Sequence, residues 1–552
     1  MPSDLKLPTK PCHNCKKRRW KCDRSLPVCQ KCIHAGSECL GYGKLLIWNQ
    51  GVARRGKMMG KSYEDLAVTK KESHGQASPP RARSTRNSDH LGTSSSSSES
   101  SHGSPPELLD REEADATIER TLIDPLVQDL NAQSRYYLYH FATQLCVDMV
   151  VYDGPGQNPI RDIIPHTSQS PVLLQVILAN AAFHIHNIAG VSLRPSVYQP
   201  DRQPDLTSYY ASVSRFGGPF TTSYHDALVA KQAALSLMAQ SVTSVDNSNI
   251  DIILVSILLF VNYELIESGK EGKWRVHMDG AQKLINMLGT ATFYQEPMSR
   301  LRRCVLSDFL VFFVLGMTLN FSANCGKLLP NSIDYEPILK YAETNNYLSC
   351  PAPLLSIMLQ SFDLPDAREV TAGEARIVIQ EQVKALLQQA LAFNPTDWAL
   401  TLELASPLEN LEKRIRIASA HRAAVCIYIA RVLPSSNPLI DPTSGNAIIS
   451  LTGLADEVVE HVSQLRPGDQ VFKSICWPLF LAGAESMKPA QRVQILKFLD
   501  ALWSEMYWGY IRTVQSVLEI IWKFSDKAVA DKDTDICWVD EVKRMGTDML
   551  IA

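Results

Sequence analysis

Six cysteines near the start of the chain have the type and spacing that metal binding requires. The 552-residue chain has 13 cysteines, and six of them fall within one stretch of about 30 residues. They are Cys12, Cys15, Cys22, Cys29, Cys32 and Cys39, in two near-identical halves of the form C-x2-C-x6-C. A tetrahedral zinc site takes four thiolates, so six cysteines hold two zinc ions only if two sulfurs bridge both ions. The spacing therefore predicts a two-zinc, six-cysteine module whose halves fold as one unit.

The zinc ions must supply most of the folding free energy of this module, because about 30 residues cannot build an adequate hydrophobic core. No apolar segment follows Met1, so we expect no secretory signal and a reducing compartment. In such a compartment the cysteines are expected to be thiols or metal ligands, and disulfides are not expected.

Positive charge is concentrated at the same end of the chain. Residues 1–62 contain 14 Lys or Arg against three acidic residues, a formal net charge of +11, although the whole chain carries −3. The run between Cys15 and Cys22 is KKRRWK. Arg or Lys bound to guanine O6 and N7 is the commonest specific contact in the major groove, worth about 1–3 kcal/mol of discrimination. The module is therefore predicted to bind double-stranded DNA.

The string CHNCKKRRWKCDRSLPVCQKCIHAGSEC resembles the fungal binuclear zinc-cluster DNA-binding domain. The resemblance covers all six cysteines, the basic run, Cys22-Asp23 and Pro27, and it implies a small domain with two short helices. It also implies that Cys12 and Cys29 bridge the two zinc ions. By the same resemblance one site is completed by Cys15 and Cys22, and the other by Cys32 and Cys39.

The resemblance further implies how the basic residues meet DNA. Arg18 and Arg19 stand where the family approaches a CGG triplet, although lysine is commoner at the second of these positions. Phosphate contacts, which orient a protein without reading sequence, are then expected from Lys16, Lys21 and Lys31. The predicted DNA-binding residues are Lys16, Lys17, Arg18, Arg19, Lys21, Lys31, Arg54 and Arg55.

A basic arm at residues 46–62 follows the predicted zinc module at residues 1–45. Its cations, among them Arg54 and Arg55, either track DNA beside the cluster or fold back onto it, and both alternatives stay open. Together with Tyr136 to Gly156 and the later WRVHMDGAQKLI, the arm resembles regulators that carry the second type of fungal-specific transcription-factor domain. Within that group the chain is similar to the acriflavine-sensitivity-control regulators.

The remaining elements must hold and regulate this module. Residues 63–107 are rich in Ser and Pro and poor in large apolar side chains, which predicts a disordered linker. Residues 108–552 carry recurrent helical periodicity and few strand signals, which predicts a large all-α regulatory domain. The helices are expected near residues 131–152, 170–190, 224–242, 250–268, 273–288, 298–320, 376–393, 406–432, 450–465, 489–503 and 508–525. Gly190 is expected to close the second of them.

Several other interpretations are disfavoured. The helical region has no HExxH, GxSxG, phosphate-loop or DDxxD pattern, so we do not expect an enzyme. Residues 153–159, DGPGQNP, are expected to form a turn. His184 and His186 lie two apart on a helical pattern and should face different sides, which argues against a metal site. No apolar stretch is long enough to cross a membrane; the longest, residues 250–261, predicts a buried core helix. The other seven cysteines have no ligand spacing and should be buried thiols.

These observations predict a nuclear, sequence-specific transcription factor that binds zinc and DNA, acts on RNA polymerase II genes and recruits transcriptional co-regulators. The resemblance suggests control of secondary metabolism or of drug tolerance. Residues 40–107 show no sustained heptad, so a coiled-coil dimer is not expected, and homodimerisation through the helical domain stays open. Two alternatives also remain open: an architectural or repressor DNA binder whose helical domain only oligomerises, and a sensor whose helical domain binds a small apolar effector.

Overall fold

The chain divides into two compact units, Met1–Leu108 and Leu109–Ala552, in a computed structural model. The structure describes residues 10–39, 126–192, 222–288, 298–319, 334–365, 373–402, 406–530 and 537–552, with short gaps inside these ranges. The predicted arm and linker lie outside the described residues, as do Lys17, Arg54 and Arg55.

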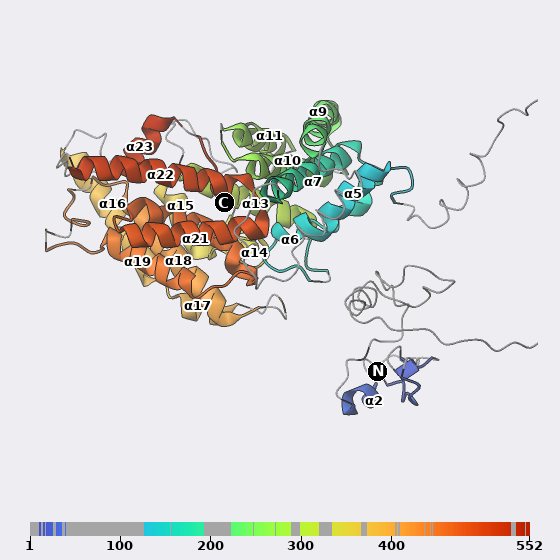
Figure 1. Ribbon diagram of the computed structural model, residues 1–552. Helices are drawn as coiled ribbons and strands as arrows, with labels where there is room; N and C mark the ends of the chain where they lie inside the picture. The colour runs from blue at the N-terminus through green and yellow to red at the C-terminus, as the bar shows by residue number, and fades with distance from the viewer. Residues whose placement is uncertain are drawn as a thin grey trace, which may run out of the picture. The chain divides into compact units, whose positions relative to one another are not determined.

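The second unit is predominantly helical in its described residues, where the β-type backbone pairing is limited to one isolated bridge between Val150 and Asn346. Figure 1 shows α5, α7, α9 and α10 at one end of this unit and α16 to α19 at the other. The α-helices are α5 (Ala132–His140), α6 (Cys146–Asp148), α7 (Pro171–Ser192), α9 (Ser223–Ser241), α10 (Ile250–Glu267), α11 (Lys273–Leu288), α13 (Arg300–Met317), α14 (Glu336–Asn345), α15 (Ala352–Ser361), α16 (Gly373–Ala392), α17 (Pro395–Thr401), α18 (Leu411–Ala430), α19 (Leu451–Ser463), α20 (Cys476–Glu485), α21 (Pro489–Met506), α22 (Gly509–Ala530) and α23 (Trp538–Met545).

Each helix that the periodicity predicts has a counterpart, with two differences of detail. The segment expected at residues 131–152 runs from α5 through the π-helical residues Phe141–Leu145 into α6. The expected end of α7 at Gly190 is wrong, because the helix continues to Ser192 and Gly190 does not adopt a left-handed backbone. Ser170 does cap the start of α7, since its hydroxyl accepts a hydrogen bond from the Leu173 amide at 3.4 Å.

The hydrophobic periodicity of the sequence did not predict five helices: α14, α15, α17, α20 and α23. In α20 all ten residues are buried. A helix that is apolar on every side has no alternation between a buried and an exposed face, so no 3.6-residue pattern marks it. The others have at most ten residues, which gives the pattern too few turns to recur.

The core of the helical domain is built around its most apolar helices. In α10, 15 of 18 residues are buried, as expected for the longest apolar stretch of the sequence. The expectation that no apolar stretch is long enough to cross a membrane is wrong for α7, because its first 20 residues are long and apolar enough by length and composition. Of their most apolar window, 72% is buried inside the domain, where α7 packs against α9 and α10. This is the environment of a core helix. Six of the seven scattered cysteines are buried and form no disulfide, as predicted, and Cys325 lies outside the described residues.

A polar junction joins α7 to the turn between α21 and α22. The Asn187 side-chain amide donates to the carbonyl oxygens of Ile266 and Tyr507, each at 2.8 Å. One turn earlier, His184 Nε2 lies 2.6 Å from the Met506 carbonyl oxygen. Burial lowers the pKa of His184 to about 4, so the ring is neutral and Nε2 donates its only proton to this carbonyl. His184 therefore has a structural role, and His186 lies beside Phe183 and Tyr224 instead.

Candidate metal centre and nucleic-acid interface

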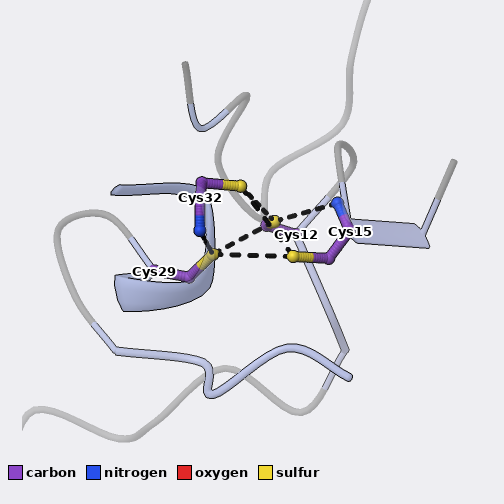
Figure 2. Close-up of side chains that lie close together, drawn as sticks. All are labelled: Cys12, Cys15, Cys29 and Cys32. Atoms are coloured by element: carbon purple, nitrogen blue, oxygen red, sulfur yellow. Dashed lines mark hydrogen bonds between the residues drawn. The ribbon is translucent and has the colours of Figure 1, made fainter. Parts of the chain in front are cut away.

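Four cysteine sulfurs converge at the centre of the N-terminal unit. Figure 2 shows Cys12 and Cys15 facing Cys29 and Cys32. The Sγ atoms of Cys12 and Cys29 lie 3.6 Å apart, and the other cross-pairs lie at 3.7 to 3.8 Å. All four side chains are fully buried. A zinc–sulfur bond of about 2.3 Å gives a tetrahedral edge of about 3.8 Å, so this separation fits thiolates around zinc.

A second ligand group shares a sulfur with the first. Cys22 and Asp23 join Cys29, and their potential ligand atoms all lie within 4.8 Å of one another. Cys22 Sγ also accepts a hydrogen bond from the Cys12 amide at 3.4 Å. Cys39 packs against the cysteine cluster and is partly buried, but it lies outside both groups. Among the described residues of the whole chain, these two groups are the clusters of His, Cys, Asp and Glu that could hold a metal ion.

The two halves of the unit fold alike around their first cysteine. Cys12 Sγ accepts from the Cys15 amide at 3.4 Å, and Cys29 Sγ accepts from the Cys32 amide at 3.3 Å. In each half this contact caps a helical turn, and in the second half Cys29 is the N-cap of α2 (Gln30–His34). The repeated C-x2-C spacing thus places both first cysteines in the same local geometry, at the interface between the halves.

Burial makes these thiols poor anions unless a cation replaces their protons. Burial raises the pKa of Cys12 to about 12, and it raises the pKa of Cys29 further. Burial also acts to raise the pKa of Cys22, but hydrogen bonds from the Cys12 and Arg24 amides outweigh it and lower that pKa to about 7. Zinc binds thiolates and releases their protons, so a buried set of sulfur donors fits zinc chemically as well as geometrically.

The predicted DNA-binding residues that the structure describes surround this centre and point outward. Lys16, Arg18, Arg19, Lys21 and Lys31 are all exposed. They come from the turn between Cys15 and Cys22 and from α2, so the cysteines fix the backbone that carries them. The structure brings these five cations to the surface of one small unit.

Arg19 has a left-handed backbone, with φ at 55°. The Trp20 amide donates to the Cys15 carbonyl oxygen at 2.8 Å, and the Arg19 amide donates to that of Lys16 at 3.4 Å. This pair of bonds is the Schellman motif, which ends a helix at a left-handed residue that is usually glycine. The turn fixes the direction in which the Arg19 side chain leaves the backbone, a constraint that the sequence did not reveal.

Asp23 is a structural residue to which the sequence assigned no role. Its two carboxylate oxygens accept hydrogen bonds from the Gln30 and Lys31 amides, both at 3.0 Å, and the Ser25 hydroxyl also donates to it. These contacts, with that of Ser25 first, hold the pKa of Asp23 well below its usual range. Asp23 therefore caps α2 from seven residues away and ties the first half to the second.

Replacing Asp23 with alanine is expected to weaken zinc binding about fivefold, because the first amides of α2 lose their acceptor. Competition with a chromophoric zinc chelator measures this directly. Asp23→Asn is the matched control: it keeps one of the two acceptor oxygens, so its loss should be smaller. Equal losses for the two variants would show that one acceptor oxygen does not retain the cap, and that both oxygens or the negative charge of Asp23 are required.

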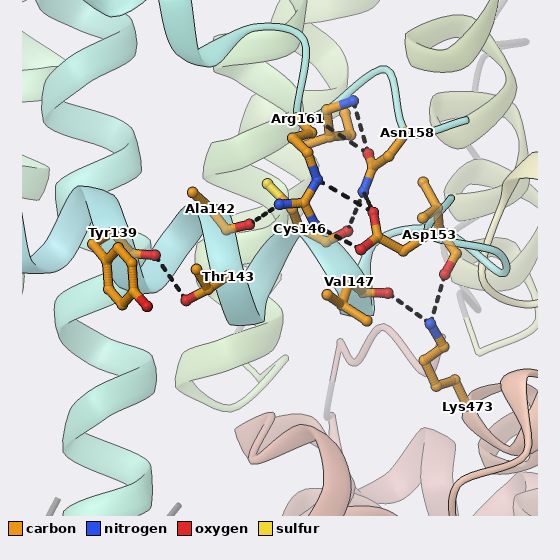
Figure 3. Close-up of polar contacts among 11 residues, drawn as sticks. Tyr139, Ala142, Thr143, Cys146, Val147, Asp153, Asn158, Arg161 and Lys473 are labelled. Atoms are coloured by element: carbon orange, nitrogen blue, oxygen red, sulfur yellow. Dashed lines mark hydrogen bonds and ion pairs between the residues drawn. The ribbon is translucent and has the colours of Figure 1, made fainter. Parts of the chain in front are cut away.

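The loop at residues 153–159 is a turn, as predicted, and not a phosphate site. Figure 3 shows the side chains that fix it. Arg161 pairs with Asp153 at 2.6 Å, and Asn158 donates to the Cys146 carbonyl oxygen at 2.7 Å. Lys473, which lies 323 residues after Val150 in the chain, donates to the Val147 and Val150 carbonyl oxygens, both at 2.6 Å. The cations here are used to bind the protein's own backbone and carboxylate.

The pockets in the described part of the helical domain include two that border polar side-chain pairs. One has a volume of about 220 Å³ and is lined in part by the buried ion pair of Arg431 and Glu485. The other, of about 290 Å³, is lined in part by Tyr137 and Asp226, which are hydrogen-bonded to each other at 2.7 Å. Ligand pockets usually span about 300–1,000 Å³ and are mostly apolar. The volume of the first pocket is below this range, and that of the second is close to its lower end.

Comparison with known proteins gives consistent matches over both units. A family model described as the fungal Zn(2)-Cys(6) binuclear cluster domain matches residues 10–46, and one described as the fungal-specific transcription factor domain matches residues 136–552. The acriflavine sensitivity control protein acr-2 of Neurospora crassa is 29% identical, over 98% of this chain and 97% of that protein. A phomenoic acid biosynthesis cluster-specific transcriptional regulator of Leptosphaeria maculans is 19% identical, over 93% of this chain and 85% of that protein. No solved structure gives a significant match.

Proposed function

The chain belongs to the fungal-specific transcription factors and carries a Zn(2)-Cys(6) domain, and from this premise we propose that it reads CGG-containing duplex DNA in the nucleus. The observation that carries the proposal is a buried sulfur centre surrounded by exposed cations on one small unit. The family and the names of its relatives indicate a transcription regulator and not an enzyme.

In this proposal two zinc ions are held by all six cysteines. Cys12 and Cys29 bridge the ions, Cys15 and Cys22 complete one site, and Cys32 and Cys39 complete the other. The Sγ atom of Cys29 lies close to those of Cys15 and Cys32 and also falls in one ligand group with Cys22, so it is near ligands of both proposed sites, which supports its bridging role. The equivalent turn at Cys12 supports the same role for its counterpart. Zinc supplies the folding free energy of the unit and fixes the two helical turns that carry the cations.

DNA recognition is divided between two kinds of contact. Arg18 and Arg19 read base edges in the major groove, whereas the lysines around them and the basic arm contact phosphates and set the orientation. The helical domain recruits co-regulators of RNA polymerase II and couples binding to transcription. The names of the two relatives support control of drug tolerance or of secondary metabolism as the physiological role of the protein.

Selection of randomised duplexes by the zinc-loaded full chain tests this function. It is done at about 0.15 M salt, because phosphate contacts dominate binding at lower ionic strength. A single enriched CGG triplet is expected for a monomeric reader, and paired triplets at a fixed spacing would indicate dimerisation through the helical domain. Enrichment of no sequence would contradict the proposal.

Arg19→Gly is expected to lower affinity for the selected duplex about 10- to 100-fold and to change affinity for a scrambled duplex little. Glycine suits the left-handed backbone at this position, so the variant removes the guanidinium without straining the turn. Arg19→Lys retains a cation and is the matched control. An equal loss on both duplexes would mean that Arg19 contacts phosphate and does not read bases.

A further inference from the structure

Trp20 contacts both the cysteine centre and an exposed arginine. Its ring is partly buried against the cluster of Cys12, Cys15, Cys29 and Cys32. The Arg18 guanidinium carbon lies 4.9 Å from the ring centroid, which is within cation–π range. The ring thus connects an exposed cation to the buried cysteine cluster.

We propose that Trp20 is a positioning residue that holds Arg18 for base reading and thereby raises the sequence specificity of the protein. This inference rests on the proposed DNA-binding function and deepens it. A guanidinium that lies over an aromatic face uses its π surface for that contact, and its N–H donors lie at the edge of the plane, which is the geometry of a bidentate contact with guanine.

The gain in specificity comes from the restricted conformational freedom of the Arg18 side chain. An exposed arginine samples many rotamers, and fixing them upon binding costs conformational entropy. A ring anchored to the metal centre restricts these rotamers before DNA binds. Part of the conformational entropy is therefore lost during folding, and less is lost upon binding. Without the ring, Arg18 would still supply a positive charge, but its direction would be less constrained.

The two arginines are therefore oriented by different devices. Arg19 is directed by the Schellman turn of its own backbone, whereas Arg18 is directed by the side chain of Trp20. The Trp20 amide also closes the turn that sets Arg19, through its hydrogen bond to the Cys15 carbonyl oxygen. That contact comes from the backbone, so substitution of the Trp20 side chain leaves the turn at Arg19 in place and acts on Arg18 selectively.

The inference is tested on the full-length protein with Trp20→Leu and Trp20→Phe. Affinity is measured for the selected duplex and for a scrambled duplex at the same salt concentration, and bound zinc is measured for every variant. Trp20→Leu is expected to lower the ratio of the two affinities about two- to fivefold, the size of a cation–π contact at an exposed site. Trp20→Phe retains an aromatic face and should keep most of the ratio, and both variants should bind as much zinc as the parent.

A double-mutant cycle separates positioning from packing. In an Arg18→Ala background the effect of Trp20→Leu on the ratio should disappear, because there is no guanidinium left to orient. Persistence of the effect in that background, or a loss of affinity that is equal on both duplexes, would overturn the inference and leave Trp20 a packing residue. If the parent protein selects no sequence at all, the proposed function itself fails, and the assignment of Trp20 fails with it.

Discussion

Replacing Cys29 with alanine is expected to abolish zinc binding by the N-terminal unit and to lower affinity for the selected duplex at least about 100-fold. Cys29 is the sulfur common to both ligand groups, and its Sγ also caps α2. Binding of structural zinc contributes about 10–16 kcal/mol to the folding of such small modules, so loss of a shared ligand affects the whole unit. Metal analysis of the purified chain and titration with duplex DNA measure the two effects.

Cys426→Ala is the matched control for this change. Cys426 is an equally buried thiol, but it lies in α18 of the helical domain and has no metal-ligand spacing to another cysteine. This variant should keep its zinc and its affinity for DNA. If the Cys29 variant retained the full zinc content, the bridging role proposed for this residue would be wrong.

The second large effect is expected in the helical domain, at Gly509. This residue begins α22, and a Cβ atom added there would overlap the carbonyl group of Glu267 at the end of α10. The obstructing atoms belong to the backbone carbonyl groups of Glu267 and Ile266, so no rotamer change can relieve the clash and one helix must move. Gly509→Ala should therefore lower the free energy of unfolding of this domain by about 3 kcal/mol or more, measured by chemical denaturation followed by circular dichroism.

Gly280→Ala is the matched control, and it is expected to change the free energy of unfolding of the same domain in the opposite direction. Gly280 lies inside α11, and a Cβ atom there would meet nothing within 4 Å. Alanine is better than glycine in a helix interior, so this variant should be stabilised by about 0.5–1 kcal/mol. If both variants behaved alike, the close approach of α10 and α22 would not be what makes glycine necessary at position 509.

The metal centre could be predicted from the sequence because its information is local. Two residues between paired cysteines bring both sulfurs to one side of a helical turn, and the repeat of the pattern places the second pair opposite the first. The exposed cations follow from the same geometry, since side chains between fixed cysteines cannot be buried in so small a unit. The spacing does not predict contacts between the two halves of the unit. The cap that Asp23 forms on α2 is such a contact.

The turn at Arg19 and the contact of the Trp20 ring with Arg18 could not be predicted from the sequence, for a related reason. Arginine is an unusual residue for a left-handed position, so nothing in the run KKRRWK marks the end of a helix there. The cation–π contact of Arg18 depends on where Trp20 is anchored, which is set by the folded cluster. In both cases the residue types were noticed, but their geometry comes from the tertiary structure.

In the helical domain, the long helices were visible in the sequence, and the five that were missed have at most ten residues each. The helix α20 has no exposed side, so its sequence resembles any short apolar run. Gly190 shows the opposite error, because a residue that commonly ends helices lies inside one here. Helix propensity is a weak local preference, so a glycine in the last turn of α7 does not by itself end the helix.

The junction at Asn187 has a consequence for how the protein is made. The carbonyl group of Tyr507 that Asn187 binds lies 320 residues later in the chain. At about 5–20 residues per second, the ribosome needs about 15–60 s to synthesise that interval. Throughout this time α7, whose mean hydropathy suits a membrane span, lacks the partner that completes its surroundings. The nascent chain should therefore depend on chaperones that shield apolar helices until α21 and α22 emerge.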